Sequence, residues 1–136
     1  MSRYVPEELR SEVAKRAAYR CEYCQAYERH SFLAFHIEHI ISLKHGGSST
    51  EDNLAYACSV CNFHKGTDIA TFLPDQDVPT RFFHPRKDTW EEHFEVDSSG
   101  ELVPKTDVAA ATIKILQLNH PDSVIERKAM LDKGIF

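Results

Sequence analysis

The segment FHIEHIISLKHGGSSTEDNLAYACSVCNFHKG, residues 35–66, decides how the chain is interpreted. It opens with an apolar run that contains two histidines and a glutamate, breaks at a Gly-Gly pair, and ends shortly after two cysteines that are separated by two residues. A second C-x2-C pair, Cys21 and Cys24, lies upstream. The two cysteine pairs therefore bracket the run that carries the histidines.

The cysteine pattern is typical of a zinc site. Cys21 and Cys24, together with Cys58 and Cys61, would surround one tetrahedral Zn²⁺ with four thiolates, because each short loop directs both of its sulfurs at one ion. Four protein ligands leave no open position for chemistry, so this zinc would be structural. The alternative is four scattered buried cysteines, but chance rarely arranges four cysteines in two such pairs. The 33 residues between the pairs exceed the common separation in zinc ribbons and indicate an insertion.

The composition is that of an ordinary globular protein of one domain, residues 1–136, with a core motif at 21–66 and an extension at 67–136. The formal net charge of −5 is unevenly distributed. Residues 1–20 carry five basic and three acidic groups, residues 21–66 three and five, and residues 67–136 eight and thirteen. Binding of nucleic acid would therefore depend on local groups and a bound cation rather than on a broad basic face.

The sequence predicts a cytoplasmic protein without a membrane segment. No apolar run approaches the roughly 20 residues that a membrane helix needs. The N-terminal residues MSRYVPEELRSE lack the apolar stretch of a signal peptide. Cysteines in the cytoplasm stay reduced and are more often metal ligands than disulfide partners, in agreement with a zinc site.

The pattern of the chain predicts an α+β fold. Leu9, Val13 and Ala17 form an apolar stripe on a helix that begins after Pro6 and ends near Arg20. Residues 67–85 show no firm periodicity. The other predicted elements are a strand in 32–42, a short helical turn at 51–53 capped by Ser49 or Thr50, a helix after the second cysteine pair, two short strands in 89–105, and helices opened by Thr106 and by Pro121, the last closed by Gly134.

Two neighbouring residues of the predicted strand carry the chemistry. Alternation places Glu38 on one face with His36 and Ile40, whereas His39 lies on the other face. Glu38 and His39 can serve one site only if the strand ends or twists there. The turn at Gly46-Gly47 favours such an end, because glycine adopts positive φ easily.

With these elements in order, residues 21–66 resemble the HNH endonucleases, specifically the zinc-containing branch in which two C-x2-C pairs bracket the motif. The family pattern is an acid–His pair, a Gly-Gly turn, Asn-Leu, and C-x2-C followed by His or Asn and then Lys-Gly. Residues 83–94, FHPRKDTWEEHF, with the following hairpin and helices, also look like the tail of small bacterial HNH proteins. The resemblance implies a ββα-metal core, stapled by the four-cysteine zinc site, with an N-terminal helix and a C-terminal hairpin plus helices.

The resemblance also implies roles for four residues. His39 matches the general base that deprotonates the attacking water, a role that suits imidazole near neutral pH. Glu38, where the family more often has Asp, and Asn62, where many members have His, match the ligands of the catalytic cation. Asn53 matches the residue that orients the catalytic histidine and restrains the loop. All-oxygen ligands favour Mg²⁺ or Mn²⁺, which would stabilise charge on the phosphate and leaving oxygen.

Single residues also allow plainer interpretations. Asn53 and Asn62 could cap helices. His36 could be a satisfied core residue or a phosphate contact. His64 and Lys65 fit a solvated face, and both are further candidates for contacts with phosphate.

Two functions are compatible with the sequence. The first is a metal-dependent endonuclease that acts on nucleic acid, double-stranded DNA above all. The second is a catalytically inactive, zinc-stabilised module for nucleic-acid binding or scaffolding. The complete set of Glu38, His39, Asn53 and Asn62 favours the enzyme. One site per chain cuts one strand per visit, so double-strand cleavage would need a homodimer or two visits.

Overall fold

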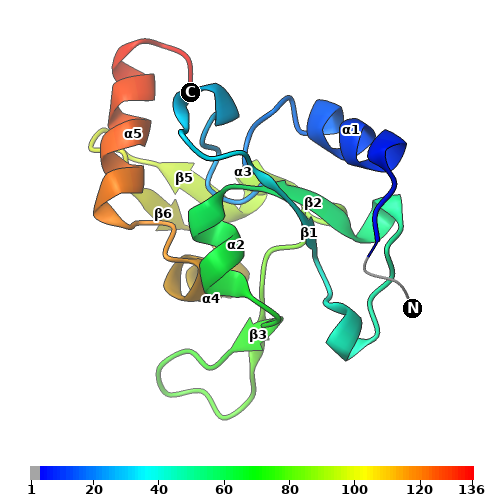
Figure 1. Cartoon of the computed structure of the whole chain (residues 1–136). Coiled ribbons are helices and arrows are strands. Elements are labelled where there is room, and N and C mark those ends of the chain that lie inside the picture. The colour runs from blue at the N-terminus through cyan, green and yellow to red at the C-terminus, as the bar shows by residue number, and fades with distance from the viewer. Residues whose placement is uncertain (1–3) are drawn as a thin grey trace.

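The computed structural model describes residues 4–136 and has the mixed helix and small-sheet composition that the sequence predicts. Each sheet is a two-stranded antiparallel pair. The helices are α1 (Glu7–Arg16), α2 (Ser59–Lys65), α3 (Trp90–His93), α4 (Asp107–Leu116) and α5 (Pro121–Asp132), and the strands are β1 (His36–His39), β2 (Leu54–Ala57), β3 (Ala70–Thr71), β4 (Thr80–Arg81), β5 (Phe94–Val96) and β6 (Leu102–Pro104) (Figure 1).

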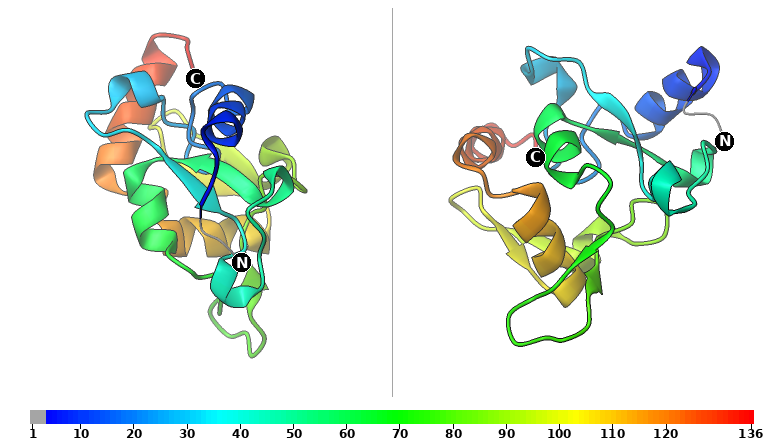
Figure 2. Two further views of the ribbon diagram at one scale, coloured as in Figure 1. Left: turned by 45° about the vertical axis from the view of Figure 1, so that its right-hand side comes forward. Right: turned by 60° about the horizontal axis from the view of Figure 1, so that its bottom comes forward.

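The β1–β2 sheet positions the candidate site. Glu38 pairs with Ala55 and His39 with Leu54, and every residue of β2 is buried. The sheet lies between α1 and α2, and both helices contact it (Figures 1 and 2). β1 ends at His39, where the backbone N–H of Ile40 turns to donate to the carbonyl of Asn53 at 2.9 Å. The strand therefore ends at His39, which meets the condition under which Glu38 and His39 can serve one site.

The first helix is shorter than predicted. It begins after Pro6 as expected but ends at Arg16, because Ala18 and Tyr19 adopt left-handed backbone angles with φ of 54° and 57°. This reversal directs the chain into the first cysteine pair. The Arg16 guanidinium crosses to the second half of the motif and donates to the carbonyls of Glu51 and Leu54 at 2.8 and 2.6 Å.

The strand predicted over residues 32–42 is also shorter, since only His36–His39 pair with β2. Residues 51–53 form the expected short turn, a 3₁₀ helix that follows Thr50. Thr50 does not cap it, because its hydroxyl bonds to the side chain of Asp52 instead of a backbone N–H. The segment without periodicity, residues 67–85, contains only the two-residue strands β3 and β4.

The C-terminal predictions are confirmed with one addition. Thr106 caps α4 by accepting from the N–H of Ala109 at 3.1 Å, Pro121 opens α5, and Gly134 follows it with φ of 69°. The β5–β6 hairpin lies in the predicted segment, but a single helical turn, α3, precedes it. α4 contacts α2 as well as β3, β4 and β6, so it joins the extension to the motif (Figure 2).

One hydrophobic cluster runs through the molecule. It joins buried residues of α1, β2 and the cysteine pairs to buried residues of the hairpin and α4. Trp90 stacks on Phe94 with 5.0 Å between ring centroids and donates from its indole N–H to the carbonyl of Tyr23 at 2.9 Å. No helix within residues 4–136 combines the length and the apolar character required to cross a bilayer.

Candidate active site and metal centre

The four cysteines meet at one point of the core. Their sulfurs all lie within 4.8 Å of one another, and all four residues are buried. Each pair closes a tight knuckle in which a backbone N–H donates to the first sulfur of the pair: Cys24 to Cys21 at 3.5 Å, and Cys61 to Cys58 at 3.4 Å. The predicted clustering of the four cysteines is confirmed.

The cluster fits a tetrathiolate zinc ion. A Zn–S bond of about 2.3 Å in a tetrahedron requires sulfurs about 3.8 Å apart, and the sulfurs of Cys24 and Cys58 are 3.7 Å apart. Hydrogen bonding to the sulfurs of Cys21 and Cys58, together with burial, raises the pKa of the Cys24 thiol well above its ordinary value. Four thiols this close cannot all ionise without a cation among them, and Zn²⁺ supplies the charge that makes four thiolates compatible.

A buried arginine supports the knuckle from the far end of the chain. Arg127 of α5 is 1% exposed and donates to the carbonyls of Leu118, Gly100 and Cys24 at 2.6, 2.7 and 3.4 Å. Burial lowers its pKa, and the nearby sulfurs of Cys24 and Cys61 oppose that shift. Zinc with four thiolates carries a net charge of −2, so this cation stands where it offsets that charge.

A second site is an open pocket of about 230 Å³ that is lined by residues of both β1 and α2. The end of β1 contributes Glu38 and His39 to its lining, and α2 contributes Asn62. Ser42 and Lys44 line it from the loop that follows β1. Three of the four residues with predicted catalytic roles therefore share one pocket, although they come from two separate elements.

His39 is held on both its side chain and its backbone. Its Nε2 lies 2.9 Å from the hydroxyl of Ser49. Its carbonyl accepts from the ammonium of Lys65 at 3.2 Å. The ring is only partly buried and lines the pocket, so a substrate can reach it.

Glu38 belongs to a buried polar network. It is 4% exposed, its Oε2 accepts from the hydroxyl of Tyr23 at 2.7 Å, and its Oε1 forms an ion pair with Lys65. Burial raises the pKa of Glu38, and the Lys65 ammonium opposes this by stabilising the carboxylate. The Lys65 ammonium also donates to the carbonyl of Ile40 at 2.9 Å. The network thus links the first cysteine knuckle, β1 and α2.

Asn53 restrains the loop between the two strands. Its Oδ1 accepts from the N–H of Ile41 at 2.9 Å, and its Nδ2 donates to the carbonyls of Ile41 and Ser48, both at 2.8 Å. Asn53 itself is buried and lies outside the residues that line the pocket. These contacts match the loop-restraining part of its predicted role.

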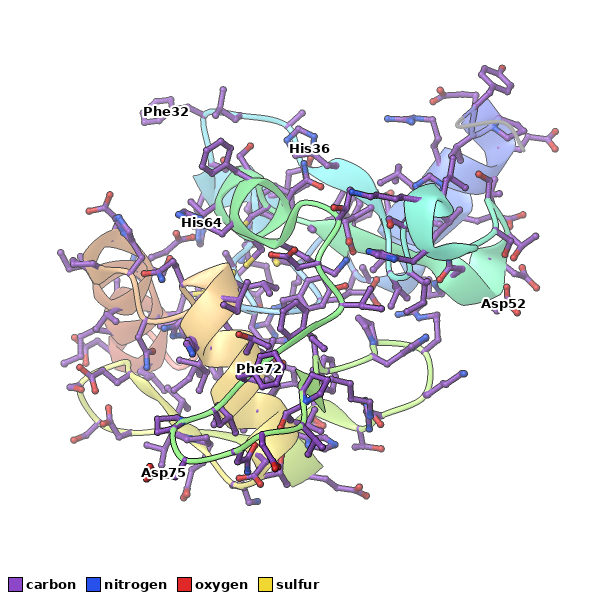
Figure 3. All side chains as sticks on the ribbon, turned by 90° about the horizontal axis from the view of Figure 1, so that it is seen from below. Phe32, His36, Asp52, His64, Phe72 and Asp75 are labelled. Atoms are coloured by element: carbon purple, nitrogen blue, oxygen red, sulfur yellow. The ribbon has the colours of Figure 1, made fainter. Side chains whose placement is uncertain are left out.

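The structure corrects the burial predicted for two of the three residues considered as phosphate contacts, Lys65 and His36. Lys65 does not lie on a solvated face, because it is 2% exposed and its ammonium is paired with Glu38. A phosphate cannot reach it without breaking that pair. His36 is exposed rather than part of the core, and its Nε2 lies 3.1 Å from the hydroxyl of Ser59. His64 is partly buried, with its Nδ1 2.9 Å from the carbonyl of Val60; Figure 3 shows His36 and His64 on different sides of α2.

The pocket meets the requirements of Mg²⁺ or Mn²⁺ only in part. Glu38 and Asn62 both line it, and Mg²⁺ commonly uses one or two carboxylates with waters and substrate phosphates as its remaining ligands. A carboxylate has about four lone-pair positions, of which Tyr23 and Lys65 engage two. The hydroxyl of Ser42, which is buried and has no hydrogen-bond partner among residues 4–136, is one more oxygen in this pocket. The charge of Lys65 opposes a second cation, so these residues would hold the metal weakly.

Sequence reasoning missed three residues of these sites. Tyr23 sits inside the first C-x2-C pair, Ser42 follows the strand, and Arg127 is distant along the chain. The position of Tyr23 between two zinc ligands was the one available signal that it would be buried beside the motif. Among residues 4–136, the four cysteines are the only group of three or more His, Cys, Asp or Glu side chains close enough to hold an ion.

Comparison with known proteins gives one match. Residues 21–68 match the family model described as HNH endonuclease. The matched segment contains both cysteine pairs, β1, β2 and α2. No curated protein and no solved structure matches the chain. The resemblance seen in the sequence is confirmed for this segment, and the four clustered cysteines agree with the zinc-containing branch.

Proposed function

On the premise that residues 21–68 form an HNH endonuclease module, we propose that the protein is a metal-dependent endonuclease that hydrolyses phosphodiester bonds of DNA. The observation that carries this proposal is the shared pocket of Glu38, His39 and Asn62. In it, β1, β2 and α2 would serve as the ββα-metal motif, with the four-cysteine zinc site as its structural staple. Reduced, metal-binding cysteines suit the cytoplasm, which we propose as its location.

His39 would act as the general base. Its ring lines the pocket, where it would accept a proton from the water that attacks the phosphorus atom. The bond between phosphorus and the leaving oxygen then breaks on the opposite side. Asn53 would act through the loop, because its amide clamps the backbone of Ile41 and Ser48 next to Ser49, the hydrogen-bond partner of His39.

Glu38 and Asn62 would hold Mg²⁺ or Mn²⁺. Such an ion supplies charge stabilisation to the phosphate and the leaving oxygen. Lys65 forms an ion pair with Glu38 and donates to the His39 carbonyl, so it would position both residues. Double-stranded DNA is the proposed substrate, and cutting both strands in one visit would require a dimer.

One observation favours the second function, an inactive zinc-stabilised module for binding or scaffolding. The Lys65 ammonium already neutralises Glu38, the acid that would hold the catalytic ion. A catalytically inactive module would be stable with this ion pair and would need no divalent cation in the pocket.

A supercoiled-plasmid assay with Mg²⁺, Mn²⁺ or EDTA separates the two functions. We expect wild type to nick the plasmid only with a divalent cation, and His39→Ala to be about 10²–10⁴-fold slower, with unchanged zinc content and circular dichroism. Asn62→Ala should be partly restored by excess Mg²⁺. The matched control is His45→Ala, since His45 is exposed and lies outside the pocket lining.

Two outcomes would count against the nuclease. Cleavage by His39→Ala at the wild-type rate would show that His39 is not the general base, and the nuclease assignment would fail. A wild-type protein that binds DNA but does not cut it in the presence of either Mg²⁺ or Mn²⁺ would establish the inactive module instead.

A further inference from the structure

The side chain of Phe63 lies largely in water on α2, the helix that contributes Asn62 to the pocket. It is 80% exposed, and its ring contacts the ring of His64 edge-on with 5.2 Å between centroids. A phenylalanine contributes little to the core from such a position, and exposing its apolar area to water is unfavourable. Neither the fold nor the proposed chemistry uses this ring.

Helix geometry puts Phe63 on the face of α2 that borders the pocket. Residues Ser59, Asn62, Phe63 and Gly66 are spaced by three, four and seven positions, and such residues share one side of a helix. Asn62 and Gly66 line the pocket. Ser59 contacts His36 of β1, which stands next to α2 in Figure 3. Phe63 is not itself a lining residue, but this spacing puts its ring on the side of α2 next to the lining residues Asn62 and Gly66.

The pocket offers few charges for holding a nucleic acid. Lys44 is the only lysine or arginine among the residues that line it. Glu38 and Lys65 neutralise each other beneath it. A strand placed against His39 would therefore gain little from phosphate contacts and needs another source of affinity. Stacking of a base on an aromatic ring is such a source, and it works with any base.

We propose that Phe63 stacks on an unpaired base next to the scissile phosphate, and that the preferred substrate is nucleic acid with unpaired bases at the cut. In an intact duplex both faces of every internal base are covered by neighbouring bases. A single strand, a bubble or a flap leaves a face free for the ring. The proposal rests on the proposed nuclease function and names the substrate class of that same site.

Cleavage of matched oligonucleotides tests the proposal. Wild type should cut a duplex with a central bubble faster than the same duplex fully paired. Phe63→Ala should lose about tenfold in kcat/KM on the bubble and little on the paired duplex, so that the preference collapses. Phe63→Trp should retain the preference, whereas Phe63→Leu, which is apolar without a ring face, should lose it.

Two controls isolate stacking. Ile125→Ala removes a side chain of α5 that is 69% exposed and outside the pocket lining, and should leave both rates unchanged. A bubble with abasic nucleotides beside the scissile phosphate removes the base itself. On that substrate wild type and Phe63→Ala should be equal, because the ring has no partner left.

Each result decides the proposal. An unchanged preference in Phe63→Ala would overturn it and leave the nuclease assignment standing. If wild type binds without cutting, the nuclease assignment fails. The preference for bubble over paired oligonucleotides is then measured as a ratio of affinities. Equal affinities of wild type and Phe63→Ala for the bubble would overturn the stacking. A wild type that neither binds nor cuts would overturn both.

Discussion

At the scale of single residues, the turn after β1 depends on one glycine more than on its neighbour. Gly46 has φ of 90° but open space around the position of a Cβ. A Cβ on Gly47 would lie 1.8 Å from the carbonyl oxygen of Ile41 and 2.7 Å from the Nδ2 of Asn53. The loop is therefore clamped so closely by Asn53 that no side chain fits at Gly47.

This difference predicts unequal effects of two adjacent substitutions. Gly47→Ala should destabilise the protein by about 3 kcal/mol or more, because backbone atoms must move to admit the methyl group. Gly46→Ala should cost only about 1–2 kcal/mol, the usual penalty for a left-handed backbone at alanine. Thermal unfolding of both variants measures the difference. Equal losses would mean that the loop relaxes freely and that the Asn53 clamp is weak.

At the scale of elements, the pair between β1 and α2 predicts an unusual dependence on pH. Lys65→Met removes the charge that opposes the effect of burial on Glu38, so the pKa of Glu38 rises further above its ordinary value. An acid with a higher pKa in the folded state binds more protons when folded, so stability is lost as pH rises through that folded pKa. We expect Lys65→Met to lose about 3–5 kcal/mol at neutral pH and to regain part of it in mild acid.

Urea unfolding at several pH values measures this effect. The double variant Glu38→Gln and Lys65→Met is the control, since it contains no buried charge at the pair and should show no such pH dependence. A Lys65→Met protein whose stability does not change with pH would show that Glu38 reaches solvent when its partner is missing.

These elements also show how far the sequence could be interpreted. The cysteine cluster and the acid–His pair depend on short spacings, so both were predictable. The partner of Glu38 was not, because the side on which α2 presents Lys65 depends on how the helix packs against β1. Alternation predicted Glu38 and His39 on opposite faces of the strand, whereas the pocket collects both, because β1 ends at His39.

At the scale of the whole molecule, the extension completes the motif. Trp90 and Arg127 both donate to carbonyls inside the first cysteine knuckle, those of Tyr23 and Cys24. Sequence patterns carry no signal for contacts over such separations, which exceed 60 residues for Trp90 and 100 for Arg127. We therefore propose that residues 1–136 fold as one domain, because the motif at 21–66 relies on the extension for these hydrogen bonds.

This dependence predicts the effect of Arg127→Met. The substitution leaves the carbonyls of Gly100, Leu118 and Cys24 buried without a donor, and each such group costs about 1–3 kcal/mol. Stability should fall by about 3–5 kcal/mol, and a chelator should remove zinc more easily. Lys128→Met is the matched control, because Lys128 is exposed and pairs with the exposed Asp132. Equal zinc retention in both variants would show that zinc binding does not depend on Arg127.

The charge of the whole chain predicts the response of DNA binding to salt. With a net charge of −5 and one lysine at the pocket, few phosphates can be neutralised. The slope of log affinity against log salt concentration should be shallow, about −3 to −4. Binding assays on one oligonucleotide across a salt series give the slope. A slope near −10 would reveal a large basic surface, such as one created by association of two chains.

The reach of Arg127 also sets an order of events during synthesis. Ribosomes build the chain from its N-terminus, so both cysteine pairs emerge long before the arginine that donates to the Cys24 carbonyl. Until then the newly made knuckle lacks that donor and the cation beside its sulfurs. Zinc acquired early would be bound by the four cysteines without the supporting contact from Arg127. That contact forms only when α5 folds back. The complete hydrogen-bonded surroundings of the metal therefore form only after α5 has been made and has folded back.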